Sequence, residues 1–302
     1  MGALIVALDD TEEGRFLAFC LALVSALSHA LFGALQKGRH DPWLTRGAID
    51  ICAGLIALPV ALFVLPLPTP GLWALPAGTF AIHLGYKYIL AMAYARAAYT
   101  VVYPVVRGTG PLVTVMAAGM VFGETFAPLQ WGGVLVLSGA IFALAGFNLR
   151  RAPVGRRTLF GALALAFLTG IFVALYTTYD AWGIRMAHNP FTFLAWFFVV
   201  DGLVLPVLAL RRWIGMAAPP APLPLLARGL AGAGIAYLSF GAVMLATRLD
   251  KVGEAAVLRE TSAVFAALIG WPFLREQVGP VRAALMGLIA LGAVLVEFGG
   301  RH

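Results

Sequence analysis

Apolar residues fill the chain in long runs that are separated by short polar connectors. A membrane-spanning helix needs about 20 mostly apolar residues, because the hydrocarbon core of a bilayer is about 30 Å thick. The predicted spans are, approximately, residues 17–35, 48–65, 73–95, 98–122, 129–147, 159–182, 191–210, 225–247, 252–273 and 281–298. No long polar segment remains for a soluble domain. The pattern therefore predicts an all-α integral membrane protein with ten transmembrane helices.

The composition supports this assignment and also indicates which classes of binding partner to expect. Of the 302 residues, 61% are hydrophobic and 12% are charged, and the mean hydropathy is +0.91. Soluble proteins average about 45–50% apolar and about 25% charged residues, so lipid must be the solvent for most of this chain. The net charge of +7 comes from basic residues that stand mainly in the connectors, where they orient helices. We therefore expect a lipid bilayer, and no nucleic acid, as a partner.

The chain divides into two halves of five predicted spans each. Between the fifth and sixth spans lies "NLRRAPVGRRT", which holds four arginines and a proline. The expected organisation is an N-terminal tail at 1–15, a first repeat at 16–148, a basic linker at 149–158 and a second repeat at 159–299.

The halves also share uncommon residues at matching positions. Residues 92–128 align without a gap on residues 244–280, and at an offset of 151 Asp50 meets Asp201. The matching pairs are Met92 with Met244, Arg96 with Arg248, Val105 with Val257, Arg107 with Arg259, Thr109 with Thr261, Glu124 with Glu276 and Pro128 with Pro280. An odd number of spans per repeat places the second copy upside down, so we predict two inverted repeats around a central cavity.

Two stretches carry a resemblance to a known family. They are "GPLVTVMAAGMVFGETFAPLQWGGVLVLSGAIFAL" and, more loosely, "TSAVFAALIGWPFLREQVGPVRAALMGLIALGAVL". A helix that closes on a Glu a few residues before a Pro, followed by a glycine-bearing span, resembles the EamA branch of the drug/metabolite transporter superfamily, although "FLRE" lacks the usual glycine before its Glu. The resemblance covers nearly the whole chain.

The resemblance also carries expectations about activity and orientation. It implies the export of metabolites, amino acids among them, and we expect a multi-pass protein of the bacterial inner (plasma) membrane. The family pattern implies that both termini lie inside. The distribution of Lys and Arg over the connectors instead favours both termini outside, by the positive-inside bias.

Ionisable residues within spans are costly, so each is a functional candidate. Arg107 lies nine residues past Ala98, hence about 14 Å deep at about 1.5 Å per residue, close to mid-membrane. Its planar fork of N–H donors suits a carboxylate, phosphonate or phosphate. Its repeat mate Arg259 would approach the same cavity, and Tyr103 shares a helix face with Arg107. A structural salt bridge is the alternative role for these arginines.

Three carboxylates are candidates for coupling transport to an ion. Glu260 could neutralise Arg107, hold a substrate amine or carry the coupled proton, and a packing ion pair is the alternative. Asp50 and Asp201 could relay protons or, equally, link to a connector arginine such as Arg46.

Further polar residues in the spans are candidates for substrate contact. His83, Lys87 and Tyr94 share a face of the third span, and their positions in the second repeat hold no charged or aromatic residue. A specific substrate should be recognised where the internal symmetry is broken. His29 in the first span and Asp180 in the sixth are weaker candidates, since a lone polar residue in a span often only bonds a neighbouring helix.

No HExxH, CxxC, GxxxxGK[ST] or GxSxG motif occurs, so we predict no catalytic residues, metal site or cofactor. The resulting hypothesis is a secondary transporter, an exporter, that moves a small polar metabolite with an anionic group, such as an amino acid or related zwitterion, by alternating access. Protons are the candidate coupling ion. Two alternatives stay open: a flippase or flippase subunit for a lipid-linked anionic headgroup, and an intramembrane enzyme, which the absent motifs disfavour.

Overall fold

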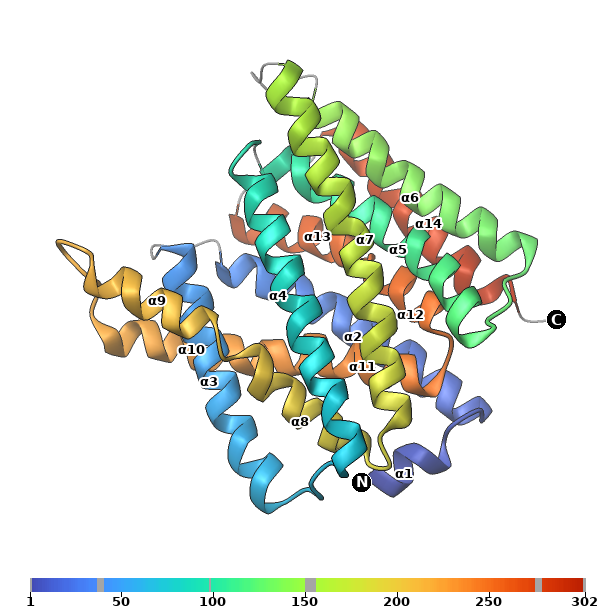
Figure 1. The fold of residues 1–302 in the computed structure, drawn as a ribbon. Helices are drawn as coiled ribbons and strands as arrows, with labels where there is room; N and C mark the ends of the chain where they lie inside the picture. The colour runs from blue at the N-terminus through green and yellow to red at the C-terminus, as the bar shows by residue number, and fades with distance from the viewer. Residues whose placement is uncertain (1, 37–40, 98, 150–155, 275–278, 301–302) are drawn as a thin grey trace. The chain divides into compact units, whose positions relative to one another are not determined.

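The computed structural model describes residues 2–36, 41–97, 99–149, 156–274 and 279–300, and within these ranges the chain is helical with no strand (Figure 1). The prediction of an all-α membrane protein is confirmed. Most of the predicted basic linker, and the turn at Glu276, lie outside the described residues.

The helices follow the predicted spans closely. They are α1 (Gly2–Ala7), α2 (Glu12–Gln36), α3 (Pro42–Phe63), α4 (Ala74–Tyr94), α5 (Tyr99–Phe122), α6 (Pro128–Leu149), α7 (Arg156–Met186), α8 (Pro190–Asp201), α9 (Leu205–Ile214), α10 (Pro222–Ala236), α11 (Ala242–Leu249), α12 (Val252–Arg259), α13 (Ser262–Leu274) and α14 (Pro280–Phe298), with a 3₁₀ turn η1 (Pro70–Trp73) and a π-helical turn η2 (Tyr237–Gly241).

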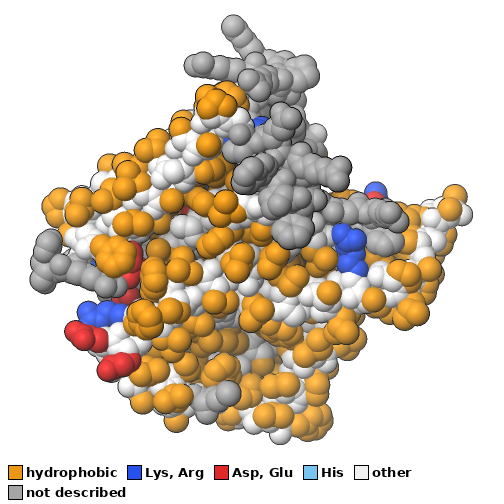
Figure 2. Space-filling view, turned by 180° about the vertical axis from the view of Figure 1, so that it is seen from behind, with side chains coloured by type: hydrophobic (Ala, Val, Ile, Leu, Met, Phe, Trp, Pro, Cys, Tyr) orange, Lys and Arg blue, Asp and Glu red, His pale blue; other side chains and the backbone are white. Residues whose placement is uncertain are grey.

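Eight helical segments of the described chain are long and apolar enough to cross a membrane: 12–35, 42–63, 102–122, 128–149, 159–186, 190–214, 222–249 and 280–298. Large apolar side chains such as Phe63 and Met120 are more than four-fifths exposed, and Figure 2 shows one face covered mostly by hydrophobic side chains. Such a surface is suited to lipid. The third and ninth predicted spans are helical but are not among the eight, so the count of ten stays a prediction.

Both of these exceptions have a physical cause. Helix α4 is long enough, but three tyrosines, His83 and Lys87 lower its hydropathy. The ninth predicted span is divided into α12 and α13 at Glu260 and Thr261, and neither helix alone would cross a membrane. The seventh span is likewise divided, between α8 and α9, and the eighth contains η2.

The described helices form two compact units, each drawn from both predicted halves. Unit 1 comprises Met1–Ala81 and Trp182–Leu249, and unit 2 comprises Ile82–Ala181 and Asp250–His302. The chain passes from one unit to the other within α4, within α7 and after α11. The proposed boundaries of the sequence repeats therefore differ from those of the compact units, and the repeats themselves stay a prediction.

In unit 1, α3 packs against α8, α9 and α10, and α2 lies along α11 and η2. Glycines allow the close approach of these helices. A Cβ atom added to Gly229 on α10 would lie 2.5 Å from the carbonyl oxygen of Ala48 on α3. Leu44, Ala48, Ala209 and Leu225 form a small apolar core there.

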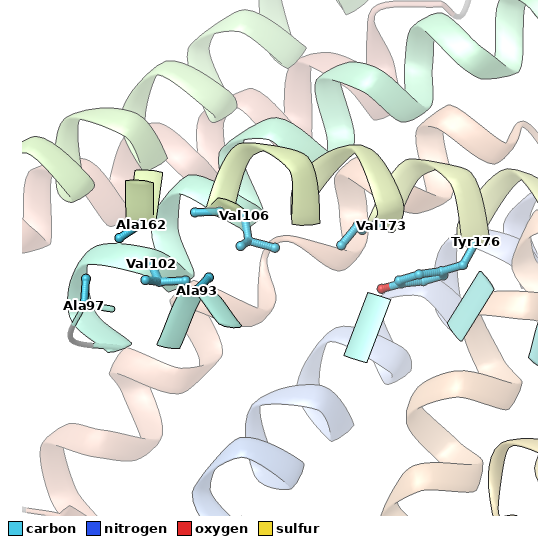
Figure 3. Close-up of a cluster of buried hydrophobic side chains, with 8 residues drawn as sticks. Ala93, Ala97, Val102, Val106, Ala162, Val173 and Tyr176 are labelled. Carbon is cyan, nitrogen blue, oxygen red and sulfur yellow. The ribbon is translucent and has the colours of Figure 1, made fainter. Parts of the chain in front are cut away.

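In unit 2, α6 lies along α14, and α5 packs against α6 and α12 (Figure 1). A second apolar core joins α4, α5 and α7; Figure 3 shows Val102 and Val106 of α5 among its members, with Tyr176 of α7 at one end. Small residues dominate this core, which lets the three helices approach closely.

Glu124 fixes the end of α5 and the start of α12. Helix α5 ends at Phe122, and the next residue, Gly123, has a left-handed φ of 69° that favours glycine. The Glu124 carboxylate then accepts hydrogen bonds from the backbone N–H groups of Val252 (2.7 Å) and Gly253 (3.2 Å), which would otherwise lack acceptors at a helix N-terminus. The glycine before this Glu is thus needed for the turn that aims the carboxylate at α12.

Candidate functional site

Arg107 lies on a part of α5 whose backbone is irregular. Pro104 and Pro111 both lie inside α5, and Pro111 has no N–H to bond the carbonyl oxygen of Arg107 four residues earlier. Helix α7 packs tightly beside this segment, since a Cβ atom on Gly170 would lie 2.5 Å from the Cβ atom of Thr109. The arginine therefore lies on a helix that contains two prolines and has a close neighbour, and it is only 8% exposed.

Arg107 forms an ion pair with Glu260. One Nη atom of Arg107 donates to Oε1 of Glu260 at 2.8 Å, and Glu260 is 3% exposed. Burying either charge alone would cost several kcal/mol, so the pairing is needed for both groups to remain ionised inside the helix bundle. This is one of the roles that the sequence left open for Glu260.

The junction of α12 and α13 presents Arg259 and Glu260. Around it the backbone bonds tighten to the i to i+3 type: Glu260 N donates to Val257 O, and Ala263 N donates to Glu260 O. The Thr261 hydroxyl bonds the carbonyl of Leu258 at 2.6 Å. Arg259 is 5% exposed and also interacts electrostatically with the Glu260 carboxylate. Both arginines of the predicted pair thus act on one buried carboxylate.

Aromatic side chains surround these charges. The guanidinium carbon of Arg107 lies 5.2 Å from the ring centre of Tyr103, a cation–π contact. Tyr94 and Tyr176 both interact electrostatically with Arg107, and Tyr176 does so with Arg259 as well. In the structure Tyr103 contacts Arg107, and Tyr94 and Tyr176 lie close enough to interact with its charge.

His83 joins this group through Tyr176. Its Nε2 atom lies 2.8 Å from Oδ2 of Asp180, and its ring lies 4.6 Å from that of Tyr176. His83 and Asp180 are 5% and 3% exposed. Lys87, one turn further along α4, is partly buried in the same unit. The contact between His83 and Asp180 was not predicted, although both residues had been candidates.

Three predicted candidates belong to unit 1 instead. His29 of α2 contacts the Ser239 hydroxyl of η2 through Nδ1 at 3.3 Å. Asp50 of α3 and Asp201 of α8 both bind Arg46, whose Nε lies 2.8 Å from Oδ1 of Asp50 and whose Nη2 lies 3.7 Å from Oδ2 of Asp201. The link to Arg46 is one of the two roles that the sequence left open.

The sequence analysis missed Tyr176, for which one signal was present. Tyr176 lies four residues before Asp180 and hence on the same face of α7. In the described part of the chain, no group of three or more His, Cys, Asp or Glu side chains could hold a metal ion. The chemistry available at the site is therefore that of two guanidinium groups, carboxylates, tyrosine hydroxyls and an imidazole.

Comparison with known proteins finds a family similarity in the second half of the chain. Residues 160–298 match the model of the EamA-like transporter family. The search of curated proteins returned no match. A solved crystal structure of another protein superposes with a TM-score of 0.74 at 17% sequence identity, covering 95% of this chain and 99% of the other, a likeness that concerns the fold alone. With the helical architecture described above, the match over residues 160–298 supports a multi-pass membrane protein that is similar to the EamA family of the drug/metabolite transporter superfamily.

Proposed function

We propose that this transporter moves a small metabolite with an anionic group, such as an amino acid or a related zwitterion, out of the cell by alternating access. The observation that carries the proposal is the buried Arg107–Glu260 ion pair, with Arg259 and Tyr103 beside it. Two guanidinium groups against one carboxylate leave an excess of one positive charge in this group, which favours an anion.

The geometry suits a zwitterion better than a simple anion. A guanidinium has five N–H donors in a planar fork, so Arg107 can hold Glu260 and a substrate carboxylate at the same time. Glu260 would then face the substrate amine, while Tyr103 and Tyr94 would pack on the solute or bond it. The remaining candidates, Lys87 and His83, would contact the variable part of the substrate.

The interrupted helices support movement between two states. Transporters bind their substrates where helices are discontinuous, because the irregular backbone can line a cavity. The α12–α13 junction carries Arg259 and Glu260 themselves. Rearrangement at this junction would change the contacts of Arg259 and Glu260 with the substrate as the site opens to one side of the membrane and then to the other.

A thermal-shift screen of the purified protein tests the proposal. The probes are the standard L-amino acids, the amines made by decarboxylating them and the carboxylic acids made by removing their amino groups. We expect stabilisation by one set of amino acids, weaker stabilisation by the matching acids and none by the amines. Arg107→Lys, which keeps the charge but loses the fork, should weaken the apparent affinity about tenfold, or about 1.4 kcal/mol.

Arg96→Gln is the matched control, since Arg96 is exposed just after α4 and donates a hydrogen bond to the carbonyl oxygen of Met92 on that helix. It should bind as the unaltered protein does. Any amino acid found this way should then exchange across proteoliposome membranes. An amino acid whose affinity is unchanged by Arg107→Lys would overturn the proposal, and stabilisation by polyprenyl phosphates alone would replace it with the flippase.

A further inference from the structure

Unit 1 buries a second charged group, at a place where two helices of the unit meet. Arg46 and Asp50 lie one turn apart on α3, and Asp201 is the last residue of α8. The Asp50 and Asp201 side chains are 4% and 13% exposed, and that of Arg46 is 23% exposed. We call Arg46, Asp50 and Asp201 the acidic triad.

The acidic triad lines a small cavity. The other lining residues are small or aromatic, and they include Phe197, Phe198 and Phe240. The cavity volume is about 10 Å³, which is room for about one water molecule. The backbone closes in at the same point, since a Cβ atom on Gly202 would lie 2.8 Å from the carbonyl oxygen of Asp50. A metabolite does not fit here, whereas a water molecule that receives or delivers a proton does.

The charges of the acidic triad do not balance. Two carboxylates face one guanidinium, so the ionised triad carries an excess of one negative charge in an apolar setting. Like charges that share a buried site do not both ionise readily, and such a pair takes up one proton as a unit. Arg46 is also held over the ring of Phe32 at 5.2 Å, which fixes the guanidinium beside the carboxylates.

Other titratable groups on the packed elements have bonding partners outside the acidic triad. On η2 the Tyr237 hydroxyl donates to Ala53 O at 2.6 Å, and on α2 His29 contacts Ser239. On α10 Arg228 bonds the carbonyl of Leu35, and on α9 Arg212 binds Asp41 while Arg211 is exposed. Of the residues that line the cavity, Arg46 is the only one with a positive charge.

We propose that the acidic triad is a proton-binding site in which Asp50 and Asp201 share one exchangeable proton. In the loaded state one carboxyl O–H and one carboxylate accompany Arg46, and the net charge is zero. On release the proton passes to water in the cavity and leaves both carboxylates on Arg46. A bound metal cation would instead have to share the site with the guanidinium at 2.8 Å from Asp50. The match of Asp50 with Asp201 in the two sequence halves is an independent observation in favour of a paired site.

This inference rests on the proposed function only for its use in driving transport, because proton binding can be measured without a substrate. The measurement is an infrared pH titration of purified protein that carries ¹³C at the aspartate side-chain carboxyl groups. The isotope separates aspartate from buried glutamates such as Glu254 and Glu297. We expect an isotope-shifted carboxylic-acid band that disappears as the pH rises, with the amplitude of one proton per molecule.

Single variants test whether the proton is shared by Asp50 and Asp201. In Asp50→Asn or Asp201→Asn one carboxylate remains opposite Arg46, a balanced pair that stays ionised, so each single variant should lose the whole band. Asp180→Asn is the control, because Asp180 is a buried aspartate that binds His83 in unit 2, and it should keep the band. Absence of the band in the unaltered protein, or its survival in either triad variant, would overturn the inference. The infrared result does not depend on amino-acid binding. The proposed proton site and the proposed amino-acid site can therefore be disproved independently.

Discussion

Each compact unit buries one cluster of charged side chains, and the two clusters have opposite compositions. In unit 2 two arginines, Arg107 and Arg259, act on the single carboxylate of Glu260. In unit 1 two aspartates bind the single guanidinium of Arg46. Both clusters lie among aromatic rings and are largely removed from solvent, so the sign of the excess charge is the main difference between them.

That difference indicates which kind of ion each cluster would accept. A buried excess of positive charge is lowered by an anion, and a buried excess of negative charge is lowered by a proton. In unit 2 the nearby Asp180 supplies another carboxylate, and its contact at 2.8 Å is with the His83 ring. The comparison thus favours our two proposals, solute binding in unit 2 and proton binding in unit 1, each from the contacts of its own unit.

Breaking the unit 2 ion pair should have the largest effect on stability. Arg107→Ala leaves Glu260 buried without the partner that lies at 2.8 Å. The free energy of unfolding should fall by about 3 kcal/mol. This is the lower end for such changes, because Arg259 still neutralises part of the Glu260 charge. Unfolding in mixed detergent micelles with increasing dodecyl sulfate measures it. The double variant Arg107→Ala/Glu260→Ala should regain much of the loss. If it is as unstable as the single variant, the two side chains do not depend on each other.

Disturbing the close packing beside each cluster should have the second-largest effect on stability. Gly170→Ala would press against Thr109 near Arg107, and Gly202→Ala would press against the backbone of Asp50; we expect each to cost about 1–3 kcal/mol. The matched controls are Gly161→Ala and Gly54→Ala, where the nearest atoms would lie 4.0 and 3.6 Å from the new Cβ atom.

These controls should be neutral or slightly stabilising, since alanine favours a helix over glycine. The same unfolding assay compares all four variants. Gly170→Ala should also weaken amino-acid binding, while Gly202→Ala should alter only the carboxylic-acid band. A reversed pattern would show that the roles of the two clusters have been exchanged.

The sequence was most informative about the helices and about single charges. Runs of apolar residues locate the helical segments because lipid requires each spanning backbone to satisfy its own hydrogen bonds. The cost of burying charge singled out Arg107, Glu260, Asp50 and Asp201, and the structure gives each of them a partner of opposite charge.

Contacts between distant residues were not predictable in the same way. His83 and Asp180 are 97 positions apart, and nothing in the spacing of either helix says that their faces meet. The break at Glu260 and the π-helical turn η2 were also missed, because hydropathy over a window of about 20 residues does not register one irregular turn. Tyr176 was missed because a tyrosine within a span is unremarkable until its neighbours are known.

The smallest expected effect concerns a third Arg–Asp pair, which lies at the exposed start of α3 and serves as a reference for the acidic triad. Asp41 accepts hydrogen bonds from the N–H groups of Trp43 and Leu44 and binds Arg212 at 2.7 Å. Burial acts to raise the pKa of Asp41, but the Arg212 guanidinium and the two N–H groups outweigh it and lower that pKa below its ordinary value of 3.8.

The stability contributed by Asp41 should therefore be present above pH 3.8 and be lost as the pH falls through the lowered pKa. Asp41→Asn keeps the helix cap and should cost a few tenths of a kcal/mol, whereas Asp41→Ala loses the cap and should cost about 1 kcal/mol. Melting curves recorded from below pH 3.8 to neutral pH measure both variants and the pH dependence. The carboxylic-acid band of the triad should persist in Asp41→Asn, because that proton belongs to Asp50 and Asp201. If the band vanished with Asp41, the titrating carboxyl would be the one that binds the exposed Arg212, and the inference of a proton site in unit 1 would be wrong.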